Sequence, residues 1–137
     1  MPYSRLFYHF VWTTKRRIPF ITQSNRTYIY DAISAKVDEL AGMVFALNGM
    51  DEHVHLVVNV PAKIAVVDFV RFVKGASSHV ASRVTTEYEP FAWQAEYGVL
   101  TISESHLPTV VQYVELQQQH HALNTLDKRL EFGNGDV

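Results

Sequence analysis

Two histidines separated by one residue are the side chains in this sequence best suited to chemistry: His53 and His55, on either side of Val54. They open the segment HVHLVVNV, residues 53–60, whose β-branched residues predict a strand. Side chains alternate faces along a strand, so both imidazoles project from one face with their Cα atoms about 7 Å apart. Two imidazoles so placed can bind one divalent cation. The same pair also fits a polar patch on a face that is solvated or covered by a second subunit.

A phenol and a carboxamide form the second group of candidates. Tyr113 and Gln117 are four residues apart in a segment with helical periodicity, so they lie one turn apart on the same helix face. A glutamine oxygen can complete a metal site beside two imidazoles and leaves positions for phosphate oxygens and water. Glu115 is an alternative carboxylate ligand, but it points away from that face. The spacing also fits a helix on which Tyr113 only packs.

The segments that must position these side chains are predicted from the periodicity of apolar residues. A tight turn is expected at Asn48-Gly49-Met50-Asp51, because Asn and Gly favour turn conformations. Strands are expected over residues 6–13, 43–47 and 53–60, with two short ones over 91–93 and 99–102. Helices are expected from residue 24 or 25 to 41, over 64–84, and from 103 or 105 to about 123.

This order of elements matches a ferredoxin-like split βαβ arrangement with an added C-terminal helix. The predicted fold class is α+β, with an antiparallel sheet and helices on one face. In the strand over residues 53–60, the aliphatic side chains alternate with the histidines and should face the core. These are Val54, Leu56, Val58 and Val60. The histidines should therefore project from the opposite face of the sheet.

Length and composition indicate one globular domain. The chain has 137 residues, of which 47% are hydrophobic and 19% are charged. It has no cysteine, which excludes a disulfide framework, a thiolate zinc site and a cysteine nucleophile. We expect a domain over residues 1–124 and a short, frayed tail over 125–137. No signal-peptide pattern and no run near the ~18 apolar residues of a membrane span is visible, so a cytoplasmic location is expected.

The charge pattern leaves room for a phosphate-binding face. Twelve Lys and Arg against fourteen Asp and Glu give a net charge of −2, which argues against binding duplex nucleic acid through bulk charge. Basic residues nevertheless cluster within residues 1–20 and 61–86, either as a phosphate-binding face or as a solvated surface. Neighbouring aromatic residues could stack on unpaired bases or lie in the core: Tyr8, Trp12 and Phe20. The candidate nucleic-acid contacts are Lys15, Arg16, Arg17, Lys74 and Arg83.

Taken together, these motifs resemble the single-tyrosine transposases of the HUH nuclease superfamily, the IS200-like insertion-sequence transposases. The resemblance runs from about residue 8 to 121 and includes YHFVWTTKRRIPFI, GMDEHVHLVV, FAWQAEYGVLTISES and YVELQQQHH. The HUH motif of the family corresponds to His53-Val54-His55, and its Tyr-x-x-x-Gln motif corresponds to Tyr113 and Gln117.

This resemblance implies an enzyme that cleaves single-stranded DNA and transfers the strand. Tyr113 would be the nucleophile and would form a 5′-phosphotyrosine, while His53, His55 and Gln117 would hold Mg²⁺ or Mn²⁺. No nucleotide cofactor is expected. The family recognises hairpins at the ends of insertion sequences and works as homodimers with composite active sites, in which the tyrosine helix of one subunit meets the histidine pair of the other. From one chain, Tyr113 could serve either its own histidine pair or that of a second subunit.

Two other functions fit the same residues. A domesticated or inactive relative would bind hairpin DNA or RNA without cutting it. An unrelated metal hydrolase would use the H-x-H pair with a third histidine, His120 or His121, although the sequence lacks a general-base motif such as H-E-x-x-H. Covalent attachment to DNA would separate the transposase from both alternatives.

Overall fold

The computed structural model describes residues 4–85, 89–117 and 119. Four antiparallel strands form one sheet in the order β2-β3-β1-β4. The strands are β1 (Phe7–Thr13), β2 (Met43–Gly49), β3 (His53–Asn59) and β4 (Gly98–Ile102). The helices are α1 (Arg26–Glu39), α2 (Val66–Val84) and α3 (Leu107–Glu115), with short 3-10 turns at Lys15–Arg17 and Glu104–His106. The order β1-α1-β2-β3-α2-β4 with this sheet is the predicted ferredoxin-like α+β fold, followed by the added helix.

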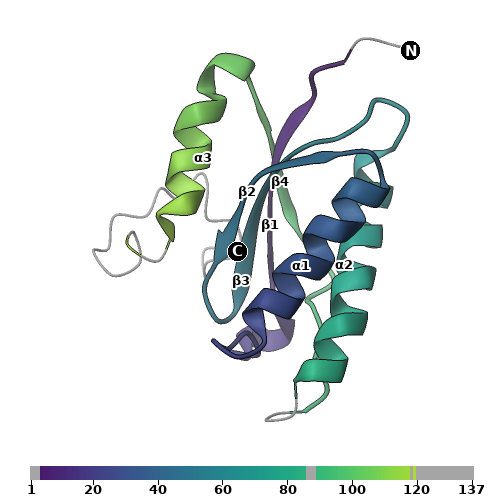
Figure 1. Cartoon of the computed structure of the whole chain (residues 1–137), viewed down its shortest axis with the longest axis vertical. Coiled ribbons are helices and arrows are strands. Elements are labelled where there is room, and N and C mark those ends of the chain that lie inside the picture. Colours follow the sequence, from purple (N-terminus) through teal and green to yellow (C-terminus); the bar gives the residue numbers. More distant parts are fainter. Residues whose placement is uncertain (1–3, 86–88, 118, 120–137) are drawn as a thin grey trace.

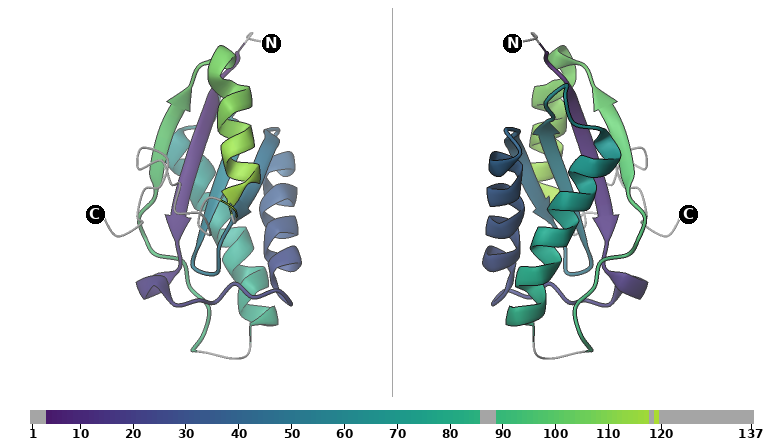
Figure 2. Two further views of the ribbon diagram at one scale, coloured as in Figure 1. Left: turned by 90° about the vertical axis from the view of Figure 1, so that its left-hand side faces the viewer. Right: turned by 90° about the vertical axis from the view of Figure 1, so that its right-hand side faces the viewer.

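The sheet separates two layers of helices. Helices α1 and α2 lie side by side on one face, and α3 lies alone on the other (Figures 1 and 2). The larger core fills the space between the sheet and the helix pair. Side chains from β1 and β3 meet those of both helices there, and the members include Phe10, Trp12, Val54, Leu56, Val58, Ile29, Ile33, Val37, Phe69 and Val73. The predicted core face of β3 is therefore confirmed.

A smaller apolar cluster joins α3 to the opposite face of the sheet. Val110 and Val114 of α3 pack there with Val57 of β3, and Phe7, Ala46 and Ile102 complete the cluster. Because residues i and i+2 of a strand share a face, Val57 sets the face on which His53 and His55 lie. The two histidines therefore lie in the layer between the sheet and α3.

The turn before β3 differs from the prediction. Strand β2 continues to Gly49, with Asn48 paired to His55 and Gly49 paired to Val54, so the chain reverses over residues 50–52. A Cβ atom on Gly49 would lie 2.1 Å from the carbonyl oxygen of His53. Glycine is needed here because the backbones approach so closely, and its value to the hairpin lies in this contact rather than in the turn itself.

Two other expected elements differ from the prediction. The segment expected as a strand over residues 91–93 makes a single bridge, between Trp93 and Thr14. Helix α3 ends at Glu115, and Leu116 is a turn residue with φ −98° and ψ 22°. The Nδ2 atom of Asn48 donates to the carbonyl oxygen of Glu115 at 3.1 Å, which satisfies one of the carbonyls left at the helix end. The predicted tail, residues 125–137, lies outside the described residues.

Candidate active site

The two histidines of β3 are buried beneath α3. His53 is 2% exposed and His55 is 0% exposed. Their ring centroids are 5.1 Å apart, and the ring planes are inclined by 75°. The alternation of the strand thus brings both imidazoles to one side of the sheet, as the sequence predicts.

Tyr113 lies on the same side, on the face of α3 that meets the sheet. Its side chain is half-buried at the margin of the smaller apolar cluster. Its ring centroid is 6.3 Å from that of His55, and the ring planes are inclined by 73°. Because α3 packs on β2 and β3 of the same chain, the phenol lies next to the histidine pair of its own chain.

Gln117 follows Tyr113 by four residues and is fully buried, at 0% exposed. It comes after the turn residue Leu116 rather than within α3, so its position does not follow from helical spacing alone. Glutamine is seldom fully buried, and a buried carboxamide needs polar partners. His120 and His121, the alternative third ligands, lie outside the described residues.

Each histidine of the pair is held through its Nδ1 atom. The Nδ1 of His53 lies 2.6 Å from Oε1 of Glu52, and the Nδ1 of His55 lies 2.8 Å from Nε2 of His9. The rings of His9 and His55 are stacked with their centroids 5.0 Å apart. Imidazoles that bind metals are commonly held in this way by one nitrogen and ligate with the other. The arrangement is therefore suited to ligation through Nε2 of both rings.

His53, His55 and Gln117 could supply only part of the ligand set of a divalent cation. Within residues 4–85, 89–117 and 119, no group of three or more His, Cys, Asp or Glu side chains is arranged to hold a metal ion. The candidate donors are instead two imidazole nitrogens and the amide oxygen of Gln117. Such a set leaves several coordination positions for phosphate oxygens and water, which suits an ion that acts on a bound phosphodiester.

The basic residues predicted to contact nucleic acid lie in two places. Lys15 and Arg16 are exposed beyond the end of β1, where both pair with Glu89, while Arg17 pairs with Glu52. Lys74 and Arg83 lie on α2, across the sheet from the histidines. The Nζ atom of Lys74 donates to the carbonyl oxygens of residues 94, 95 and 96 at 2.5, 3.2 and 3.2 Å, and burial lowers the pKa of Lys74 to about 8. Lys74 thus holds the segment that leads into β4.

Two of the three aromatic residues considered for base stacking are core residues instead. Trp12 is 1% exposed and Phe20 is 0% exposed, whereas Tyr8 is half-buried at the edge of the larger core. Neither buried ring can stack on an unpaired base without leaving the core. Within the larger core, Trp12 packs edge-on against Trp93 and Phe20 packs against Phe91, with ring centroids 5.8 and 5.2 Å apart.

Sequence reasoning missed three residues of the site: His9, Glu52 and Asn48. The alternation in β1 could have identified His9, since Phe10 and Trp12 on one side of the strand leave His9 on the side of the histidine pair. Glu52 is the residue directly before His53, in the hairpin turn. Asn48 was assigned to a turn, although it lies in β2 opposite His55.

Comparison with protein families identifies the group to which this site belongs. The family model described as "Transposase IS200 like" matches residues 2–117. The chain belongs to the IS200-like transposase family. The matched range includes His53, His55, Tyr113 and Gln117, so the resemblance found in the sequence extends over the whole candidate site of this transposase.

Known relatives support the same assignment. The ISDra2 transposase TnpA of Deinococcus radiodurans is 27% identical over 121 residues, which cover 82% of this chain and 84% of that protein. The crystal structure of a putative transposase from Deinococcus radiodurans has a TM-score of 0.67 and 26% identity, covering 85% of this chain and 93% of its own. A REP-associated tyrosine transposase bound to a REP hairpin has a TM-score of 0.67 and 15% identity, covering 88% and 72%, and shows the shared fold. None of the helices in the described part of this IS200-like transposase could span a membrane.

Proposed function

We propose that this IS200-like transposase cuts single-stranded DNA and transfers the strand through a covalent phosphotyrosine at Tyr113. The observation that carries the proposal is the position of Tyr113, whose ring lies 6.3 Å from that of His55 at the edge of a buried histidine pair. The family match over residues 2–117 supports it, because it covers the tyrosine and both histidines.

The cleavage step forms one bond to phosphorus and breaks another. The Oη atom of Tyr113 attacks the scissile phosphorus, the bond between phosphorus and the 3′ oxygen breaks, and the DNA 5′-phosphate stays on the tyrosine. The phenol gives up its proton, and a proton is delivered to the leaving 3′ oxygen. A free tyrosine has a pKa of about 10, so the phenol must be activated by its surroundings. Because the phosphotyrosine keeps the energy of the broken ester, a 3′-hydroxyl can later reverse the step without ATP.

The three side chains proposed to hold Mg²⁺ or Mn²⁺ are His53, His55 and Gln117. When bound, the ion would act as a Lewis acid on the phosphate that Tyr113 attacks. The chain itself contributes a rigid strand for both imidazoles, with Nδ1 of each held by Glu52 or His9. Burial of the imidazoles and of Gln117 excludes bulk water from these groups. A substrate phosphate would complete the ligand set and lie within reach of Tyr113.

The proposed substrate is single-stranded DNA with a hairpin at each end of an insertion sequence. A relative of the same fold is bound to a REP hairpin, which supports a hairpin substrate here. Lys15 and Arg16 are exposed beyond the end of β1, the strand that carries His9, so they can follow a DNA backbone that leads to the histidines. Arg17, Lys74 and Arg83 are proposed as further contacts, although the first two also hold parts of the fold.

A homodimer is proposed as the working assembly. Strand β4 lies at one edge of the sheet, and its Val99 and Leu100 are 37% and 41% exposed. An edge strand with exposed apolar side chains favours pairing with a second copy. In that dimer Tyr113 would serve either its own histidine pair or, in a composite site, the histidine pair of the other subunit. Within the single chain, α3 packs on its own sheet and Tyr113 lies beside its own His55.

The proposal is tested by trapping the covalent intermediate. The full chain is incubated with Mn²⁺ and single-stranded DNA from the regions that flank its coding sequence, chosen for imperfect palindromes able to form hairpins. An adduct that survives a denaturing gel is expected from the wild type, and Tyr113→Phe should abolish it. Tyr28→Phe is the matched control, because Tyr28 is 58% exposed on α1, on the other side of the sheet.

Three results would contradict parts of the proposal. Undiminished adduct in Tyr113→Phe would remove the assigned nucleophile, and adduct formation that a chelator does not affect would remove the metal. Salt-dependent retention of the hairpin with no covalent product would favour the binding module that does not cut DNA.

A further inference from the structure

We propose that Glu52, itself held by Arg17, is a positioning residue that fixes the tautomer and the orientation of the His53 ring. The inference rests on the proposed function in one respect only, namely that Nε2 of His53 is the atom that ligates a divalent cation. Glu52 does not touch the reacting atoms. Its effect on the reaction passes through His53.

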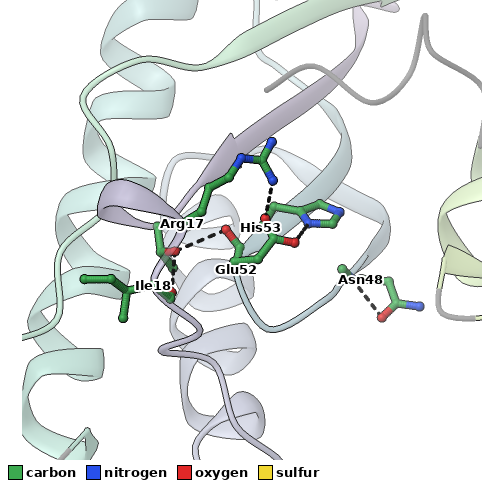
Figure 3. A network of polar contacts seen from close by, with 7 residues as sticks. Arg17, Ile18, Asn48, Glu52 and His53 are labelled. Atoms are coloured by element: carbon green, nitrogen blue, oxygen red, sulfur yellow. Dashed lines mark hydrogen bonds and ion pairs between the residues drawn. The ribbon is translucent and has the colours of Figure 1, made fainter. Parts of the chain in front are cut away.

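The carboxylate of Glu52 lies between a guanidinium and an imidazole. Its Oε1 atom is 2.6 Å from Nδ1 of His53, and its Oε2 atom is 2.5 Å from Nη1 of Arg17 (Figure 3). An ionised carboxylate can only accept hydrogen bonds, so Nδ1 of His53 must carry the proton. In the neutral imidazole, Nε2 then presents its lone pair, which is the form that binds a metal ion.

Burial strengthens this contact. The His53 side chain is 2% exposed and that of Glu52 is 18% exposed, whereas Arg16, which precedes Arg17, and its partner Glu89 are 61% and 42% exposed. Hydrogen bonds to charged groups are stronger where water is excluded, while exposed ion pairs contribute little. The contact between Glu52 and His53 is thus better able to hold a side chain in place than the exposed pair of Arg16 and Glu89.

The backbone around Glu52 is fixed from both sides. The amide of Thr14 donates to the carbonyl of Glu52 at 2.8 Å, and the amide of Ile21 donates to the carbonyl of Asp51 at 2.9 Å. These bonds tie the turn before β3 to the loop after β1. The Glu52 carboxylate therefore has little freedom to leave His53.

The loop that presents Arg17 adopts an unusual conformation. Arg16 and Arg17 have φ values of 52° and 56°, the left-handed region that residues with a Cβ atom seldom occupy. The hydroxyl of Thr14 closes this turn by donating to the carbonyl of Ile18 at 2.6 Å. Backbone strain of this kind persists where the surroundings enforce it, and it concentrates at functional sites. Here it places the guanidinium of Arg17 on the carboxylate that holds His53.

The deciding experiment reads the tautomer of His53 directly. Long-range ¹⁵N–¹H spectra of the metal-free full chain, at mildly alkaline pH, distinguish a ring protonated at Nδ1 from one protonated at Nε2. The His53 signals are identified by their loss in His53→Asn. We expect the wild type to be protonated at Nδ1 and Glu52→Met to show a mixture of both tautomers. Glu89→Met is the matched control, because Glu89 pairs with the same loop and should leave the spectrum of His53 unchanged.

Binding of Mn²⁺ without DNA gives the second measurement. Glu52→Met should weaken Mn²⁺ binding by about 10–100-fold, the usual effect of losing a residue that orients a metal ligand. Arg17→Met should weaken it less, because Glu52 remains beside His53, and Glu89→Met should not change it. If Glu52→Met does not fold, Glu52→Gln keeps the size and polarity of the side chain and should still give mixed tautomers, since its amide can donate or accept.

The outcomes separate this inference from the proposed function. Wild-type His53 protonated at Nε2, or a tautomer and Mn²⁺ affinity unchanged in the folded Glu52 variants, would overturn the positioning role. A change of tautomer without any change in Mn²⁺ binding would support the positioning role and would count against His53 as a metal ligand.

Discussion

At the scale of single residues, His9 is the partner of the Nδ1 atom of His55, as Glu52 is the partner of the Nδ1 atom of His53. It is fully buried, stacked on His55, and joined to it by a contact of 2.8 Å between Nε2 and Nδ1. His9 lies opposite Val57 in the ladder between β1 and β3, so it reaches His55 along a diagonal. A buried imidazole partner of this kind keeps the His55 ring from rotating.

The substitution His9→Phe tests this role. Phenylalanine keeps an aromatic ring in the stack but removes the hydrogen-bond partner of His55, which should cost about 1–3 kcal/mol in the free energy of unfolding. Binding of Mn²⁺ should weaken by about 10–100-fold. Urea denaturation measures the first effect and Mn²⁺ titration the second. Unchanged Mn²⁺ affinity in a folded His9→Phe protein would show that His55 does not depend on His9.

The histidine pair could be predicted from the sequence, but its partners could not. The alternation in residues 53–60 placed His53 and His55 on one face and Val54 and Leu56 on the other. The partner of His55, however, depends on the register between β1 and β3, in which His9 meets Val57. The partner of His53 depends on where the turn falls. Neither is determined by local sequence alone.

At the scale of elements, the hairpin between β2 and β3 positions the histidine pair. The role of Gly49 in this hairpin can be tested by substitution. Gly49→Ala would place a Cβ atom 2.1 Å from the carbonyl oxygen of His53, so the hairpin must shift. We expect a loss of stability of at least about 1–3 kcal/mol. Gly75→Ala in α2 is the matched control, since nothing lies within 4 Å of its Cβ position and alanine is the better helix former by about 0.5–1 kcal/mol. Thermal melting curves should therefore move in opposite directions.

The end of α3 is the second element that sets the site. Asn48 holds the carbonyl of Glu115, between Tyr113 and Gln117, so Asn48→Ala should loosen the segment that carries the nucleophile. We expect a lower yield of covalent adduct with little change in far-ultraviolet circular dichroism. Asn59→Ala is the control, because the bond that the Asn59 side chain makes to the carbonyl of Leu6 is long, at 3.4 Å. Equal adduct yields from the two variants would contradict a role for Asn48.

Element boundaries were the part of the fold least accessible to sequence. Asn48 and Gly49 have turn chemistry, yet pairing with His55 and Val54 extends β2 through both of them. The helix expected to residue 123 is interrupted at the turn residue Leu116, just after α3 ends at Glu115, and a side chain from β2 takes over one of its carbonyls. In both places a contact with another element sets the boundary of the element and overrides the local propensity of the sequence.

At the scale of the whole molecule, the order of elements was predictable because periodicity defines each of them. The order implied the ferredoxin-like sheet, and α1 and α2 pack together on one face as that topology requires. The proposed homodimer is tested by light scattering, which should give a mass of two chains. The mass of a single chain at working concentrations would contradict a dimer formed through the exposed edge of β4.

The central claim is that Tyr113 becomes covalently linked to the 5′ end of cleaved single-stranded DNA. Mass spectrometry of the nuclease- and protease-digested adduct tests it most directly. The account predicts that a 5′-nucleotide is attached to the peptide containing Tyr113. Attachment to another side chain, or cleavage of the DNA with no nucleotide bound to the protein, would contradict it.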